Sequence, residues 1–167
     1  MPAETRGAAM MDDTYFNSAT YYSHIRIHWE QLVANCGGKI DLARRGVKAP
    51  MLAFALVVPS GKKNSFVNQH RPDLLIAVAR PNNDGQSLAN AFEQPLRASN
   101  GKGYVEPSIL ALSNCWDQTE ICYRLDTPHI AVLNPRGYKL PSDELTRAQV
   151  QNLPAWLEAT TVLLGEA

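Results

Sequence analysis

Residues 73–79 read DLLIAVA, an almost unbroken apolar run that Pro72 and Pro81 bracket. Two other segments have the same character: residues 51–58, MLAFALVV, and residues 128–133, PHIAVL. Each has the length of a strand and turn-forming residues at its ends. Because a strand that is apolar on both faces is buried on both faces, these runs predict a sheet that helices cover on both sides.

Two further strands are predicted at residues 108–112 and 121–125, with residues 117–120 as the turn of a hairpin between them. In such a hairpin Cys115 and Cys122 would lie on opposite strands, at the ~4.5–5.5 Å Cα separation that a disulfide accepts. The alternative is that both are free cysteines, which pack as small apolar side chains. The hairpin leaves the pairing of the two thiols open.

Helices are predicted where apolar residues recur at intervals of three and four. The first covers residues 14–35 and ends at Gly37 and Gly38, because glycine readily adopts the left-handed conformation that terminates a helix. A polar helical turn is expected at residues 41–45, closed by Gly46. Further helices are expected at residues 87–99, at residues 142–153 with Ser142 as the N-cap, and at residues 154–164 with Pro154 in the first turn.

The predicted order of elements is therefore α-β-β-α-β-β-β-α-α. It corresponds to a single-domain α/β or α+β fold with a mixed β-sheet of about five strands and helices on both faces. The length of 167 residues suits one domain, which we expect to span residues 14–167 after a flexible N-terminal leader at residues 1–13. The leader lacks the basic and apolar regions of a secretory signal.

Composition excludes several classes of protein. No apolar run approaches the roughly 18 residues of a membrane-spanning helix, so a soluble protein with no membrane partner is expected. Three cysteines are too few, and odd in number, for a disulfide scaffold, which favours a reducing, cytoplasmic location. Because no complete nucleotide-binding, metal-binding or nucleophile motif occurs, neither a cofactor nor a metal is expected.

The charges balance over the whole chain but not along it, with 16 Lys and Arg against 16 Asp and Glu. Residues 39–80 contain eight basic and two acidic residues, a net charge of +6. Residues 81–167 contain six basic and ten acidic residues, a net charge of −4. Overall neutrality therefore argues against a global attraction to nucleic acid but permits a local site for an anion.

The best candidate site is the polar segment between two of the predicted strands, residues 60–72, SGKKNSFVNQHRP. A long loop held by two buried strands commonly presents a binding site. Its donors suit the oxygens of phosphate or carboxylate groups, and the alternative is a solvated loop whose lysines only maintain solubility. The predicted ligand-binding residues are Lys62, Lys63, Asn64, His70, Arg71 and Asp73.

Pro72 and Asp73, which open the next predicted strand, resemble the start of the PD-(D/E)xK nuclease motif. In that superfamily an acidic residue at a strand start holds a divalent metal together with a nearby acid-x-Lys group. Here Val78, Ala79 and Arg80 stand where that group would be sought. The resemblance implies a degenerate, nuclease-like domain in which Asp73 is a metal ligand.

Two functions follow from these residues. The first is a non-catalytic binding or assembly module, whose basic loop holds an anionic ligand and whose aromatic helix surfaces contact a protein partner or a second copy of the chain. The alternative is a protein that acts on nucleic acid or phosphate through residues 60–73. There the lysines and arginine would hold phosphate, His70 would act as acid or base, and Asp73 would bind metal.

Overall fold

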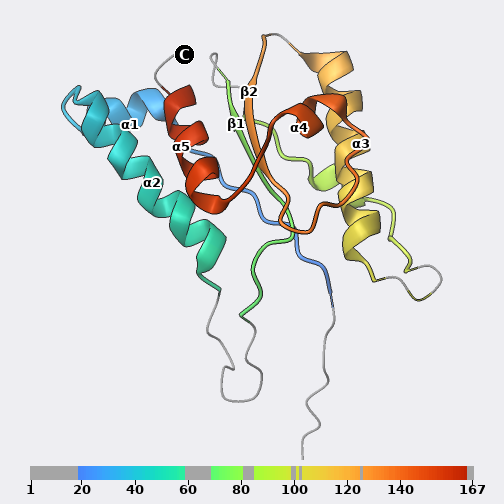
Figure 1. Cartoon of the computed structure of the whole chain (residues 1–167). Helices are drawn as coiled ribbons and strands as arrows, with labels where there is room; N and C mark the ends of the chain where they lie inside the picture. The colour runs from blue at the N-terminus through green and yellow to red at the C-terminus, as the bar shows by residue number, and fades with distance from the viewer. Residues whose placement is uncertain are drawn as a thin grey trace, which may run out of the picture.

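The computed structural model describes residues 19–58, 69–80, 85–98, 101, 103–124 and 126–164. Within these ranges the chain forms five α-helices, one 3-10 helix and three strands. Figure 1 shows the strands in the middle of the molecule with helices to either side. The predicted mixture of helices and strands is confirmed, but the prediction of about five strands is wrong.

The sheet is a mixed one, as predicted. Its strands, in spatial order, are β1 (Leu75–Ala79), β2 (His129–Leu133) and β3 (Gln149–Val150). β1 and β2 are antiparallel, with Ala77 opposite Ala131, whereas β2 and β3 are parallel. β1 and β2 lie inside the apolar runs at residues 73–79 and 128–133, so these two strand predictions are confirmed.

The apolar run at residues 51–58 is not a strand. Residues 51–56 form the last turns of α2 (Ile40–Leu56), which continues through Gly46 and Pro50, so the predicted helix end at Gly46 is also wrong. The buried residues of α2 recur at every fourth position: Ala43, Val47, Met51 and Ala55. A short apolar run fits a buried helix as well as a buried strand, and the four-residue spacing that begins upstream of it belongs to a helix.

The predicted hairpin within residues 108–125 is also a helix, α3 (Val105–Tyr123). Its buried side chains include four at helical spacing: Ile109, Leu112, Trp116 and Glu120. Cys115 and Cys122 are free thiols seven residues apart on this helix. Because seven residues of helix rise about 10.5 Å, a disulfide between the two is excluded.

The first helix is much shorter than predicted. α1 spans Trp29–Asn35, and residues 19–28 before it form no regular secondary structure, while residues 14–18 lie outside the described residues. The segment is held by a tertiary contact instead, because the hydroxyl of Tyr22 accepts the backbone N–H of Leu88 at 2.9 Å. Tyr22 therefore contacts a distant part of the chain, whereas Tyr21 and Ile25 are exposed.

The prediction of a helix at residues 87–99 is also wrong, and residue 99 lies outside the described residues. Only a four-residue 3-10 helix, η1 (Ala89–Phe92), forms there, and Pro95 follows it. The ring of Tyr22 packs against that of Phe92, with 5.6 Å between the ring centroids. This contact anchors the segment before α1 on η1.

The end of α1 is confirmed as predicted. Gly37 and Gly38 follow the helix with φ angles of 65° and 75°, in the left-handed region that glycine adopts without a steric penalty. At its start the helix is capped by His28, whose Nδ1 accepts the backbone N–H of Gln31 at 3.2 Å.

The two C-terminal helices are confirmed with different bounds. Ser142 caps α4 (Asp143–Arg147) by accepting the N–H of Leu145 at 3.3 Å, but α4 is short because β3 follows it at once. Pro154 stands in the first turn of α5 (Leu153–Leu163), as predicted.

Helices cover both faces of the sheet, as predicted, because successive side chains of β2 point to opposite sides. Ala131 and Leu133 enter a core with Met51 of α2 and Trp156 of α5, and the indole N–H of Trp156 donates to the carbonyl of Ala131 at 3.1 Å. Val132 enters a second core with residues of α3 and α4. Figure 1 shows these two helix pairs on either side of β1 and β2. Among the described helices, none combines the length and the hydropathy needed to cross a membrane.

Candidate functional site

The six predicted ligand-binding residues all lie in the connection between α2 and β1, residues 57–74, which we call the α2–β1 connection. Lys62, Lys63 and Asn64 lie outside the described residues, so their contacts stay a prediction. His70 is described and exposed. The structure therefore describes only the part of the candidate site that leads into β1, and ligand binding there stays a prediction.

Arg71 links the two ends of this connection by a hydrogen bond. Its Nη1 donates to the carbonyl of Leu56, the last residue of α2, at 3.2 Å. The bond brings the end of α2 next to the residues that enter β1. Because a guanidinium has five N–H donors, Arg71 can make this bond and still meet an anion with its other donors.

Asp73 faces an arginine that sequence reasoning missed. Its Oδ1 lies 2.9 Å from Nε of Arg136, which belongs to the turn after β2. No group of three or more His, Cys, Asp and Glu side chains that could hold a metal occurs in the described ranges. Asp73 is therefore positioned as the partner of a cation. The two residues are 63 positions apart, and nothing in the sequence indicates that they pair.

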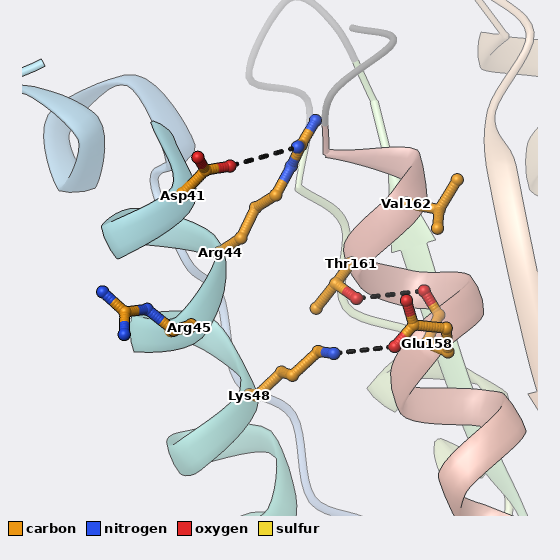
Figure 2. A pocket seen from close by; sticks show the side chains of 7 residues that line it. All are labelled: Asp41, Arg44, Arg45, Lys48, Glu158, Thr161 and Val162. Atoms are coloured by element: carbon orange, nitrogen blue, oxygen red, sulfur yellow. Dashed lines mark hydrogen bonds and ion pairs between the residues drawn. The ribbon is translucent and has the colours of Figure 1, made fainter. Parts of the chain in front are cut away.

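A second basic cluster lies on α2. Arg44, Arg45 and Lys48 follow Asp41 at the three- and four-residue spacing that makes helical side chains neighbours. Figure 2 shows this part of α2 beside α5. The two helices border an open hollow of about 420 Å³, the α2–α5 hollow, whose lining also includes Glu158, Thr161 and Val162. The spacing is visible in the sequence, but the predicted helix end at Gly46 separated Lys48 from the others.

The charges in the hollow are unequally paired. Nζ of Lys48 lies 2.7 Å from Oε2 of Glu158 and joins the two helices (Figure 2). Nη1 of Arg44 lies 3.7 Å from Oδ1 of Asp41, beyond hydrogen-bond distance. Nε of Arg44 is buried and has no hydrogen-bond partner among the described residues. Arg44 is thus a half-buried cation with unused donors.

A third charged cluster joins the end of β1 to α3. Arg80 pairs with Glu120, and its Nη1 lies 3.2 Å from Oδ1 of Asp126. Its guanidinium also lies 5.8 Å from the ring centroid of Trp116, within range of a cation–π contact. These partners are 36 to 46 residues away in the chain, so only the folded structure brings them together.

Arg124 extends this third cluster to α4. Its Nε lies 2.9 Å from Oε2 of Glu120, and its Nη2 lies 2.6 Å from Oε2 of Glu144. The indole N–H of Trp116 donates to the same Glu144 oxygen at 3.0 Å. The hydrogen bond to Glu120 raises the pKa of Arg124 above its ordinary value, against a smaller opposing effect of burial. Through these ion pairs the cluster connects α3 to the end of β1 and to α4.

Comparison with a family model covers almost the whole sequence. The Cas model described as CT1975-like protein matches residues 1–159 of the 167. The chain belongs to the CT1975-like family. The matched region contains the α2–β1 connection, the sheet and all lining residues of the α2–α5 hollow except Thr161 and Val162.

Solved structures show the same fold in longer chains. A chain of a structure described as "CRISPR RNA-guided surveillance complex" is similar at a TM-score of 0.70 and 26% identity, over 81% of this CT1975-like chain and 50% of that chain. A chain of a second, described as "CRISPR RNA-guided surveillance complex, pre-nicking", is similar at 0.71 and 26%, over 83% and 39%. The present chain thus spans half or less of these two chains. No curated protein sequence matches it.

Proposed function

We propose that this CT1975-like chain is all or part of a subunit of a CRISPR RNA-guided surveillance complex, in which it binds the guide RNA and contacts neighbouring protein subunits as a non-catalytic module. One observation carries the proposal: more than four-fifths of the chain shares its fold with chains of two such complexes, at 26% identity. Membership of the CT1975-like family supports it.

The α2–β1 connection is the surface that we assign to RNA. It belongs to the segment with a net charge of +6, and it contains Lys62 and Lys63 next to Asn64. Arg71 donates to the carbonyl of Leu56 and so holds the two ends of the connection near each other. Lysine and arginine contacts to phosphates supply most of the sequence-independent affinity for a nucleic acid. Binding along a guide of any sequence requires contacts of this kind.

Contacts with protein subunits are proposed for the exposed apolar side chains. Ile121 and Tyr123 near the end of α3 are 83% and 70% exposed, and Val57 after α2 is 70% exposed. Large aliphatic and aromatic side chains are costly to leave in water and are enriched at the centres of protein interfaces. An assembly subunit would bury them.

The RNA assignment is tested with the full chain and a labelled single-stranded RNA over a salt series. Each phosphate contact adds about 0.7 to the slope of log affinity against log salt, so the K62A/K63A double variant should lower that slope by about 1.4. The matched control is R97A/K139A, which removes two exposed cations from the acidic part of the chain. Undetectable RNA binding at low salt, or an equal loss in both variants, would contradict the assignment.

A further inference from the structure

Arg44 has hydrogen-bonding capacity that no other described residue uses. The carboxylate paired with it, on Asp41, is 3.7 Å away, and the buried Nε has no partner in the described part of the chain. A buried donor without a partner costs free energy, and a missing ligand is one physical reason for such a group in a native structure. The Arg44 side chain is 38% exposed, so part of it is open to a ligand.

The charge of the α2–α5 hollow indicates how many negative charges such a ligand carries. Three basic and two acidic side chains line the hollow, which leaves a net charge of +1. Lys48 is already paired with Glu158, whereas Arg45 has no ion pair with any described residue. A nucleic-acid strand would place successive phosphates near Asp41 and Glu158, which is unfavourable. A single carboxylate neutralises the net charge of +1 in the hollow.

Apolar side chains beside the cations indicate the kind of molecule that supplies this carboxylate. Ile40 lies one turn before Arg44 and is 50% exposed, and Leu52 lies one turn after Lys48 and is 40% exposed. Val162 lines the hollow from α5 and is also 50% exposed. Arginine next to exposed aliphatic groups is typical of a protein interface rather than of a site for a free anion.

We propose that the α2–α5 hollow docks a partner protein that inserts one Asp or Glu side chain flanked by aliphatic residues. The carboxylate accepts hydrogen bonds from the guanidinium of Arg44, and the flanking side chains cover Ile40 and Val162. The inference rests on the proposed function only in supposing that the chain has protein neighbours. The hollow is a different surface from the α2–β1 connection, to which we assign RNA.

The test uses two synthetic peptides, acetyl-Leu-Ala-Glu-Ala-Leu-amide and its Gln counterpart, titrated into the nitrogen-15-labelled full chain. The reporter is the Nε–Hε NMR resonance of Arg44, assigned by its loss in R44K. The Glu peptide should shift this resonance and saturate at about 1 mM, as expected for a single anchoring contact. The Gln peptide should bind about tenfold more weakly, because it lacks the charge.

Two variants separate this docking site from a merely structural cluster. E158Q removes the carboxylate that competes for Lys48, so the Glu peptide should bind several-fold more tightly. R44K should weaken that peptide about tenfold, since an ammonium cannot make the bidentate contact, while its affinity for RNA stays unchanged. Because R44K lacks the Arg44 resonance, its affinity for the peptide is read from the backbone amide resonances of α2. R97K is the matched control and should change neither affinity.

Several results would overturn the docking site while leaving RNA binding intact. The first is that both peptides bind equally tightly. The second is that the Arg44 resonance does not shift up to about 10 mM of the Glu peptide, and the third is that E158Q does not bind this peptide more tightly. If inorganic phosphate or single-stranded oligouridine saturates the Arg44 resonance at a lower concentration than the Glu peptide, the hollow is an RNA contact instead. Loss of RNA binding in K62A/K63A without any change in peptide binding would support both assignments separately.

Discussion

Arg80 and Glu120 form an ion pair in which both side chains are almost completely buried, at 6% and 5% exposure, although 40 residues separate them. The pair joins the residue that follows β1 to the last turn of α3. Glu120 also pairs with Arg124, so its carboxylate contacts two guanidinium groups. The packing of α3 against the sheet therefore depends on a charge balance inside the protein.

Replacing Arg80 with Met should lower the free energy of unfolding by about 3–5 kcal/mol, because Asp126 and Glu120 lose their buried partner. Urea unfolding followed by tryptophan fluorescence measures this change as a shift of the midpoint at constant slope. The control is R97M on an exposed arginine, which should change stability by less than about 0.5 kcal/mol. An R80M effect as small as that of R97M would contradict the prediction.

The double variant R80M/E120M should be more stable than the sum of the two single effects implies, because the second change removes a buried carboxylate that has already lost one of its two guanidinium partners. A double-mutant cycle from the same urea curves gives this coupling. Additive single effects would show that the two side chains contribute independently.

Replacing Tyr22 with Phe should destabilise the protein by about 1 kcal/mol, since the backbone N–H of Leu88 loses its acceptor. The local readout is hydrogen exchange, which should become faster at the Leu88 amide. Y21F is the matched control, because the neighbouring Tyr21 is 72% exposed. Unchanged exchange at Leu88 would show that the hydroxyl does not hold the segment before α1.

Two glycines should respond to alanine in opposite directions. Gly46 lies inside α2, and a Cβ there would meet no atom within 4 Å, so G46A should stabilise the protein by about 1 kcal/mol. Gly37 has a φ angle of 65°, so G37A should destabilise it by about 1 kcal/mol or more. Thermal unfolding of the two variants side by side measures both effects. A destabilised G46A would argue against a continuous α2.

Replacing Trp156 with Phe should cost about 1–3 kcal/mol, because it removes both the hydrogen bond to the carbonyl of Ala131 and part of the packing against the sheet. Trp29 lies at the margin of the same core and is only partly buried, so W29F serves as the control with a smaller effect. Urea unfolding followed by far-UV circular dichroism compares the two. Equal effects would mean that the hydrogen bond contributes little.

Part of the candidate site was predictable and part was not. The basic character of the α2–β1 connection is a property of composition. Ligand binding by Arg71 and Asp73 stays a prediction, and the structure shows each of them in contact with another part of the chain. Their actual partners, Leu56 and Arg136, follow from the closure of a long connection and from the pairing of β1 with β2. The hollow was missed because its two walls, α2 and α5, lie about a hundred residues apart in the sequence.

The sequence by itself determined several local features: the end of α1 at Gly37, the N-cap of α4 at Ser142, the start of α5 near Pro154, and the strands β1 and β2. Each of these depends on backbone geometry, or on punctuation by Pro and Gly, within a few residues. Only the tertiary structure decided that residues 51–56 and 108–123 are helical. A short apolar run is compatible with either state, and the surface on which it is buried selects between them: the core with Trp156 for α2, and the core with Val132 for α3.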